Sequence, residues 1–367
     1  MPFGDYYKGR RVLVTGHTGF KGSWLAEWLL ELGADVTGIA LPPPTEPSLF
    51  KALGLESKLH HHIGNIRDAS AVKKVVEKAK PDFVFHLAAQ SLVRDSYAEP
   101  VETYATNVMG TINLLEALRG VSAPCAAVFV TSDKCYENHE SGRSYREEDP
   151  LGGSDPYSSS KAAAEIAIAS WRRSFFRNSN AGIASGRAGN VIGGGDWAAN
   201  RIVPDAIRAL QANEPIPVRN PAAQRPWQHV LEPLSGYLHL GATIYRSLDS
   251  DASRNNDLLG AFNFGPPDGS NQSVETLVER ILSEWPGSWN DHSDPNAVHE
   301  AKLLHLSIEK ASRMLGWNPV WEFGETADRT VSWYRQASDG VDAVELTASD
   351  IVDYEAKARS RGLAWSR

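Results

Sequence analysis

Three residues have the types and the spacing needed to oxidise an alcohol. Tyr157 and Lys161 stand four positions apart, so on a helix they share one face. A lysine ammonium in that place lowers the pKa of the tyrosine, and the phenolate can then take a proton from a substrate hydroxyl. Ser132, expected at the end of a strand, can hydrogen-bond the same reacting oxygen. The tyrosine–lysine spacing alone is common, but with Ser132 it predicts hydride chemistry on a carbon that carries a hydroxyl.

Two titratable residues, Asp133 and Lys134, follow Ser132 directly. They are expected at the carboxyl end of a strand, which is where α/β proteins bind their ligands. A simple oxidation needs neither residue. An elimination needs one group to remove a proton and another to protonate a departing hydroxide. The pair therefore predicts an elimination, and the alternative is an ordinary surface turn.

A glycine-rich turn follows the first expected strand. Gly16, Gly19 and Gly22 are spaced by three, with Thr18 and Phe20 between them. Such a turn lets the backbone approach a pyrophosphate, which then rests on the N-terminus of the next helix. The position of the turn between a strand and a helix predicts a dinucleotide site, and an ordinary tight turn is the alternative.

The choice of dinucleotide depends on the residues after the next strands. The second strand ends at residues 38–41 with no acid for the adenine ribose and no arginine for a ribose phosphate, which favours NAD over NADP. Asn65 and Ile66 follow the entry of another strand, where they can meet the adenine edge. A surface turn is an equally good interpretation of these two residues.

Alternating elements must hold these groups in place. Short apolar runs alternate with amphipathic segments through the first half of the chain, which predicts βαβ units and a parallel sheet covered on both faces. The expected strands are 11–15, 35–41, 82–88 and 126–131, and the expected helices are 23–33, 69–79 and 101–119. The predicted class is α/β, a Rossmann-type doubly wound parallel sheet with a smaller mixed α/β substrate domain.

The expected domain boundaries follow from a change in the pattern of strands, helices and loops along the sequence. Residues 1–187 are predicted to form the NAD-binding domain, with segments near 228–265 returning to it. Proline-rich turns mark a substrate domain at 188–345, and 346–367 is expected to be a polar helix or tail.

Composition excludes several classes of protein. The 367 residues carry a formal net charge of −8, which argues against nucleic acid, and no apolar run is long enough to span a membrane. The charged N-terminus resembles no signal peptide, and two cysteines suit the cytoplasm. His60–His62 are expected to be a solvated helix end, with no metal site.

Several longer sequence motifs resemble those of a known protein family. From about Lys8 to Trp333 the chain resembles the extended short-chain dehydrogenase/reductase family and, within it, the CDP-glucose 4,6-dehydratases. The strings lie at 14–24, 86–90, 106–110, 131–136, 187–197 and 225–233. The related dTDP-glucose enzymes carry Thr-Asp-Glu where this chain has Ser132-Asp133-Lys134, and the lysine marks the CDP-glucose branch.

The resemblance implies a reaction and a pathway. NAD oxidises C4 of CDP-glucose with Tyr157 as base, Lys134 removes the C5 proton while Asp133 protonates the C6 hydroxyl, and hydride returns to C6. An electrostatic role for Lys134 stays open. The product would supply dideoxysugars for bacterial surface polysaccharide, and the enzyme would be a homodimer or homotetramer.

The resemblance also implies further site residues. Asn107, Ala88, Ala89 and Gln90 would lie along the cofactor. The residues implied for the nucleotide-sugar pocket are Arg94, Asn190, Arg201, Arg225 and His229. Arg225 is the first choice for the diphosphate, because a guanidinium binds phosphate oxygens bidentately. Two departures are 140–143, where an aromatic stretch is usual, and Asn65, where an aspartate is usual.

Two other functions compete with a dehydratase. A nucleotide-sugar 4-epimerase would need Tyr157 and NAD but no acid/base pair, so Asp133 and Lys134 speak against it. A non-catalytic NAD-binding regulator commonly loses the tyrosine and the lysine, and both are intact here.

Overall fold

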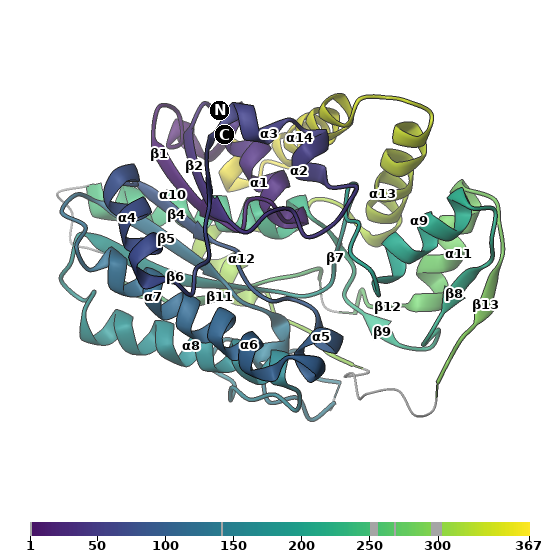
Figure 1. Cartoon of the computed structure of the whole chain (residues 1–367), viewed down its shortest axis with the longest axis horizontal. Coiled ribbons are helices and arrows are strands. Elements are labelled where there is room, and N and C mark those ends of the chain that lie inside the picture. The colour runs from purple at the N-terminus through teal and green to yellow at the C-terminus, as the bar shows by residue number, and fades with distance from the viewer. Residues whose placement is uncertain (1, 141, 250–255, 268, 295–302) are drawn as a thin grey trace.

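A computed structural model describes residues 2–140, 142–249, 256–267, 269–294 and 303–367 (Figure 1). Its centre is a seven-stranded sheet in the order β11-β6-β5-β4-β1-β2-β3, and every neighbouring pair is parallel. The strands are β1 (Arg11–Thr15), β2 (Asp35–Ala40), β3 (His60–Ile63), β4 (Phe83–His86), β5 (Cys125–Val130), β6 (Ala181–Ala188) and β11 (Ala261–Phe264).

Helices cover both faces of this sheet. Strand side chains alternate between two apolar clusters, because successive residues of a strand point to opposite faces. Val12 and Val14 pack with α1 (Phe20–Glu31) and α10 (Leu231–Asp249), whereas Leu13 packs on the opposite side. The helices on that side are α4 (Ala69–Ala79), α7 (Gly110–Leu118) and α8 (Pro156–Ser174). The predicted fold class, a doubly wound Rossmann-type sheet, is confirmed.

A second group of elements lies to the right in Figure 1. It contains three two-stranded pairs, β7 with β10, β8 with β13 and β9 with β12. The strands are β7 (Val191–Ile192), β8 (Ile216–Val218), β9 (Gln224–Arg225), β10 (Gln228–His229), β12 (Gln272–Ser273) and β13 (Trp289–Asp291). The helices near them are α9 (Ile202–Gln211), α11 (Val274–Glu284) and α13 (Phe323–Ser338).

The end of the chain is folded back onto its beginning. Helix α14 (Ala343–Ser360) is polar in sequence, yet Tyr354 on its inner side is fully buried against the rings of Trp28 and Trp365. Trp365 also stacks on Phe3, with ring centroids 5.1 Å apart. The N and C ends therefore lie side by side (Figure 1).

Two local predictions were wrong. His60–His62 form most of β3 and not a helix end. Within the described residues this strand pairs with β2 alone, and none of its side chains is buried, so the sequence lacks the alternation of a half-buried strand. The single helix expected at 101–119 is α6 (Pro100–Tyr104), a π-helical turn (Ala105–Met109) and α7. π-Helical turns are rare and occur mostly as single turns inside α-helices, so the expectation of one regular helix did not include this one.

The remaining helices are short or peripheral. They are α2 (Leu49–Ala52), α3 (Leu55–Lys58), α5 (Val93–Ala98) and α12 (Glu309–Leu315). Cys125 opens β5 and Cys135 follows its end, and both thiols are fully buried and unpaired.

Candidate active site

The glycine turn has the shape of an anion cradle. Gly16 has φ +78°, and a Cβ there would lie 2.7 Å from the Ala88 nitrogen. A Cβ on Gly22 would lie 2.1 Å from the Gly16 carbonyl oxygen, so only glycine permits this packing. Gly19 is the N-cap of α1 and offers no side-chain cap, and a Cβ there would meet only that same oxygen, at 3.5 Å. An open concave backbone at a helix N-terminus fits a pyrophosphate.

The side chains of the turn have other partners. The Thr18 hydroxyl donates to the Leu41 carbonyl at 2.8 Å, and Phe20 lies half-buried near Gly193. His17 covers the end of β2, because a Cβ on Gly38 would come within 2.4 Å of its ring. Burial lowers the pKa of His17 to about 3, so a neutral imidazole occupies this strand end. Sequence reasoning missed His17.

The predicted adenine contacts are divided between surface and core. The Asn65 amide oxygen accepts from the backbone N–H of Arg67 at 3.0 Å and from its guanidinium at 3.2 Å. Ile66 is buried against Gly110 of α7, where a Cβ would come within 2.4 Å of it. Neither side chain reaches the glycine turn by a described contact.

Asn107 ties the loop after β4 to α8. It lies in the π-helical turn, buried, and its amide oxygen accepts from the Gln90 N–H at 2.8 Å. Its amide nitrogen donates to the Gln90 carbonyl at 3.0 Å and to the Ser160 hydroxyl at 2.8 Å. Ala88, Ala89 and Gln90 are half-buried beside the glycine turn. The Asn107 side chain thus holds this loop by hydrogen bonds to the Gln90 backbone.

The structure brings Ser132, Tyr157 and Lys161 together. Pro156 and the N-cap Asp155 start α8, and Tyr157 and Lys161 are buried on its inner face. Burial raises the pKa of Tyr157 to about 12, and an interaction with the Ser132 side chain offsets part of that rise.

Lys161 is hydrogen-bonded to the end of β5. Its ammonium donates to the Val130 carbonyl at 3.4 Å, and burial lowers its own pKa to about 8. The expected lowering of the tyrosine pKa by Lys161 stays a prediction. In the structure, the Ser132 side chain and, more weakly, the charge of Arg201 lower the Tyr157 pKa.

Asp133 is a buried carboxyl beside the same serine. Its side chain is 4% exposed and accepts from the Ser132 hydroxyl at 3.0 Å. Burial raises its pKa, with a smaller opposite effect from Lys134. A Cβ on Gly189 would lie 2.7 Å from the carboxyl oxygen, so a glycine faces it. A raised pKa suits a proton donor. The alternative of an exposed surface turn does not hold for Asp133.

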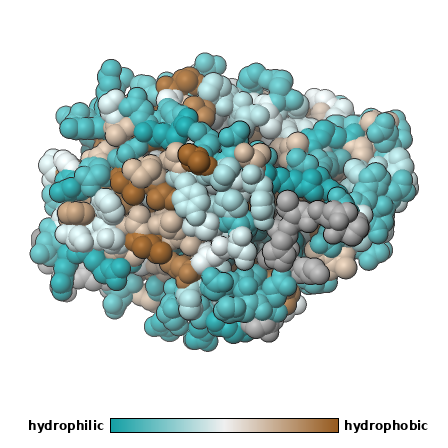
Figure 2. All heavy atoms as spheres, turned by 60° about the horizontal axis from the view of Figure 1, so that its bottom comes forward, coloured by the Kyte–Doolittle hydropathy of each residue, from teal (hydrophilic) through white to brown (hydrophobic). Residues whose placement is uncertain are grey.

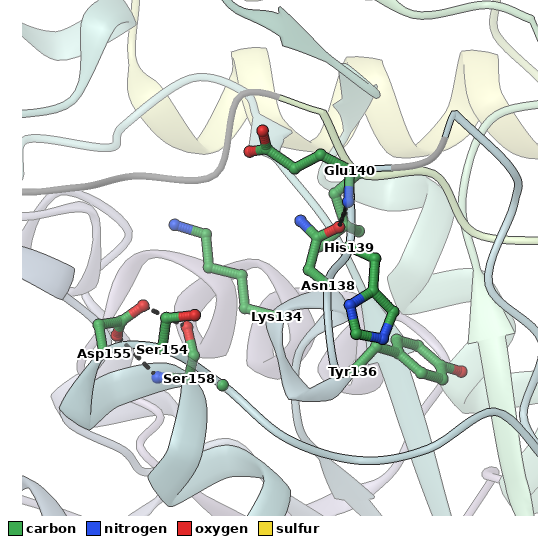
Figure 3. Close-up of a pocket in the computed structure, with 10 residues that line it drawn as sticks. Lys134, Tyr136, Asn138, His139, Glu140, Ser154, Asp155 and Ser158 are labelled. Atoms are coloured by element: carbon green, nitrogen blue, oxygen red, sulfur yellow. Dashed lines mark hydrogen bonds between the residues drawn. The ribbon is translucent and has the colours of Figure 1, made fainter.

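Lys134 points into a cavity of about 290 Å³. Figure 3 shows its ammonium between the start of α8, at Asp155 and Ser158, and the loop that carries Asn138 and Glu140. The altered segment noted in the sequence thus begins in the wall of this cavity. Of that segment, Ser141 lies outside the described residues.

Of the five implied sugar-nucleotide residues, three lie near the catalytic groups. Arg225 on β9 is half-buried, and its charge acts on Asp133. Arg201 donates to Asp196 at 2.9 Å and to Ser91 at 3.3 Å, and its charge acts on Tyr157. Asn190 follows β6, and its carbonyl accepts from the Gln228 N–H at 3.1 Å.

Two of the implied residues are placed elsewhere. Arg94 is exposed on α5. His229 is fully buried between Trp24 and Trp321, with ring centroids 5.7 and 4.8 Å away. The pairing of β10 with β7 turns His229 into the core, so the expectation that it lines the pocket is corrected.

A further cation belongs to the site. Lys21 lies inside the glycine turn, and burial, helped by the charges of Arg201 and Lys161, lowers its pKa to about 8. The only signal in the sequence was a lysine between the second and third glycines of the turn.

The described residues lack two further features. Within them, no group of three or more His, Cys, Asp or Glu side chains could hold a metal ion. No helix in the same part of the chain is long and apolar enough to cross a membrane.

Comparison with known proteins agrees with this geometry. A family model described as GDP-mannose 4,6 dehydratase matches residues 13–241. A CDP-glucose 4,6-dehydratase from Salmonella typhimurium is 46% identical over 95% of this chain and 97% of its own length. A dTDP-glucose 4,6-dehydratase from Streptomyces venezuelae, solved with NAD bound, is 25% identical at a TM-score of 0.73, over 91% of this chain and 99% of that one. A UDP-glucose 4-epimerase from Thermus thermophilus, also with NAD, is 25% identical at a TM-score of 0.72, over 89% and 99%.

The fold and the residues at its strand ends define an extended short-chain dehydrogenase/reductase. Within that class the chain belongs to the family of sugar-nucleotide 4,6-dehydratases that the matched model describes. The family resemblance and the prediction of an enzyme are confirmed.

Proposed function

We propose that this enzyme dehydrates CDP-glucose to CDP-4-dehydro-6-deoxyglucose. The observation that carries the proposal is the Ser132-Asp133-Lys134 turn, in which a buried carboxyl of raised pKa stands beside an amine in a cavity. The 46% identity to a CDP-glucose 4,6-dehydratase supports cytosine as the base.

NAD is the proposed cofactor. When bound, NAD would supply the acceptor for hydride from C4 of the sugar and the donor of hydride to C6. The cradle of Gly16, Gly19 and Gly22 would hold its pyrophosphate, and the fit is supported by the open space over Gly19. The backbone at residues 88–90, fixed by Asn107, would line its nicotinamide half.

The chain's own residues then divide the proton transfers. Tyr157, as phenolate, accepts the C4 hydroxyl proton, and Ser132 donates a hydrogen bond to the same oxygen. The resulting ketone makes the C5 proton acidic. Lys134 as a neutral amine removes that proton, and Asp133 gives its own proton to the C6 hydroxyl, which leaves as water.

Lys134 has a second possible role, as a charge that stabilises the enolate. In that case another group must remove the C5 proton. The Lys134→Met experiment in the Discussion distinguishes the two roles.

The substrate side is assigned by charge. Arg225 and Arg201 would hold the diphosphate, since guanidinium groups bind phosphate oxygens bidentately. Asn190 would contact the sugar. The charge of Arg225 on Asp133 supports a diphosphate site close to the reacting carbons.

We propose a homodimer, or a homotetramer built from it, in the cytoplasm. Large apolar side chains are exposed on α5, α6 and α8, including Val101 at 82% and Ile166 at 57%. Figure 2 turns this face forward and shows brown side chains gathered on it. A contiguous apolar patch on a folded protein marks an interaction surface.

One assay tests the function. Purified protein is incubated with CDP-, dTDP-, GDP- and UDP-glucose, and the products are identified by mass and by NMR. A 4-keto-6-deoxy sugar formed fastest from CDP-glucose is expected. A 4-epimer without loss of water would instead make the protein an epimerase.

A further inference from the structure

A buried ion pair lies beneath the catalytic turn and takes no part in the proposed chemistry. Glu165 on α8 and Arg187 on β6 are 2.8 Å apart, and each side chain is only 4% exposed. Burial alone would raise the pKa of Glu165, but Arg187 and hydrogen bonds from Thr131 and Ser185 hold it below its usual value. The pair is therefore ionised.

The acid of this pair shares a helix face with the proposed catalytic base. Tyr157, Lys161 and Glu165 follow one another at intervals of four residues along α8, so their side chains lie in one row. Any group that binds Glu165 is thereby placed relative to Tyr157.

The pair binds the residues on both sides of the acid/base turn. The Thr131 hydroxyl, just before Ser132, donates to Glu165 Oε1 at 2.6 Å. The Arg187 guanidinium donates to the Tyr136 hydroxyl at 2.8 Å and lies 4.9 Å from the centre of its ring. Only residues 132–135 separate these two anchors.

The Tyr136 hydroxyl makes a second hydrogen bond, which links it to β11. The Tyr136 hydroxyl donates to Asn263 Oδ1 on β11 at 2.7 Å. The Asn263 amide donates in turn to the Tyr145 and Ser307 carbonyls, at 3.0 and 3.2 Å. These hydrogen bonds hold Tyr136, and with it the end of the turn, against the sheet.

Stability alone is a weak explanation for this arrangement. A buried ion pair contributes little more to folding than apolar side chains of the same volume, because both charges lose their hydration. What it provides is geometry, since a guanidinium fork fixes the directions of several hydrogen bonds at once.

We infer that Glu165 and Arg187 are a positioning pair, which holds the turn of Ser132, Asp133 and Lys134 in register with Tyr157. The inference rests on the proposed function, in which Tyr157 acts at C4 while the turn acts at C5 and C6 of one sugar ring. These groups come from two different elements, and the pair joins them.

The register matters because elimination depends on distance. A displacement of about 1 Å can slow a positioned step by about 100-fold. Loosening the turn should harm elimination more than oxidation. Both groups proposed for the elimination, Asp133 and Lys134, would move with the turn, whereas oxidation would lose only the hydrogen bond from Ser132 while Tyr157 stays on its helix.

The sharpest test removes the anchors without leaving a charge unpaired. Thr131→Val and Tyr136→Phe each delete one hydroxyl that the pair holds, and the double variant releases both ends of the turn. With CDP-glucose, we expect water loss to slow by about 10- to 100-fold and the formation of bound NADH to slow much less, so that NADH accumulates. Thr131→Ser keeps the hydroxyl and should behave as wild type.

Tyr354→Phe is the matched control. It also deletes a buried tyrosine hydroxyl. This hydroxyl donates to the Glu232 carboxyl group at 2.7 Å and lies on α14, away from the turn. It should lower the unfolding free energy comparably and leave the ratio of oxidation to elimination unchanged.

Amide hydrogen exchange supplies a readout that needs no turnover. Peptides covering residues 131–136 should exchange faster in the double variant than in the wild type or in Tyr354→Phe. Wild-type exchange together with equal losses of oxidation and elimination would overturn the inference. If wild-type protein forms no 6-deoxy product from CDP-glucose, the proposed function fails, and the exchange rates still decide whether the pair positions the turn.

Discussion

Replacing Gly19 by alanine should weaken NAD binding without unfolding the protein. Gly19 has φ −81° and ψ 168°, a conformation that alanine adopts freely. The added Cβ would touch only the Gly16 carbonyl oxygen, at 3.5 Å, which is ordinary contact. It would instead project into the open mouth of the cradle, where the pyrophosphate is proposed to rest.

The size of the effect follows from what the methyl group displaces. One charge-assisted hydrogen bond between a phosphate oxygen and the helix N-terminus is worth about 1.5–3 kcal/mol, so the NAD dissociation constant should rise by about 10- to 150-fold. Alanine is a poorer N-cap residue than glycine, which lowers the unfolding free energy. Alanine also restricts the unfolded chain, which raises the unfolding free energy by nearly as much. The unfolding free energy should therefore change by less than about 1 kcal/mol.

Titration of NAD by calorimetry, with urea unfolding of the same samples, measures both quantities. Gly22→Ala is the contrasting variant, because its Cβ would lie 2.1 Å from the Gly16 oxygen and must distort the turn itself. It should lose stability and affinity together. An unchanged NAD affinity in the Gly19 variant would show that the pyrophosphate does not lie over this residue.

Five other substitutions test further features of the protein. Tyr157→Phe should bind NAD and CDP-glucose but form no NADH in stopped-flow absorbance, and normal NADH formation would remove Tyr157 from the mechanism. Asp133→Asn and Lys134→Met should both form NADH and stall before water loss. In deuterated water, slow exchange of the C5 proton in Asp133→Asn and none in Lys134→Met would identify Lys134 as the base. Exchange in both variants would make Lys134 an electrostatic group. Arg225→Ala should raise KM far more than it lowers kcat, because a diphosphate contact is equal in ground and transition states; a fall in kcat alone would place Arg225 in the chemistry. Burial raises the pKa of Glu232 to about 7 from an ordinary 4.5. Between these two pH values the folded state keeps a proton that the unfolded state releases. The contribution of Glu232 to the unfolding free energy should therefore fall by about 3 kcal/mol as the pH rises from 4.5 to 7. Urea unfolding at pH 5 and pH 8 should show this fall in the wild type relative to Glu232→Gln, and parallel curves would refute it.

Local patterns predicted much of the fold. The glycine turn and the buried strand expected at 126–131 depend on neighbouring residues, and the structure has that strand at Cys125–Val130. The placement of Asp133 and Lys134 followed from the rule that α/β proteins bind ligands at the carboxyl ends of their strands, whereas Ser132, Tyr157 and Lys161 were grouped by their types and spacing.

Long-range placement could not be obtained in the same way. His229 has the polarity of a ligand residue, but a two-residue strand pairing turns it inward. Arg187 stands in a string that pointed to the family, yet its partner Glu165 is 22 positions away and on another element. Such contacts depend on the packing of a helix on a sheet, and no periodicity in one segment records them.

The two buried cysteines make the protein a convenient host for chemical labels. Burial raises the pKa of Cys125 to about 12 and that of Cys135 further, and both thiols are inaccessible, so neither should react with maleimides in the folded state. A cysteine introduced at Glu140, in the wall of the Lys134 cavity, would then be the single reactive thiol. A fluorophore attached there would report substrate entry directly, without any need to remove the native cysteines first.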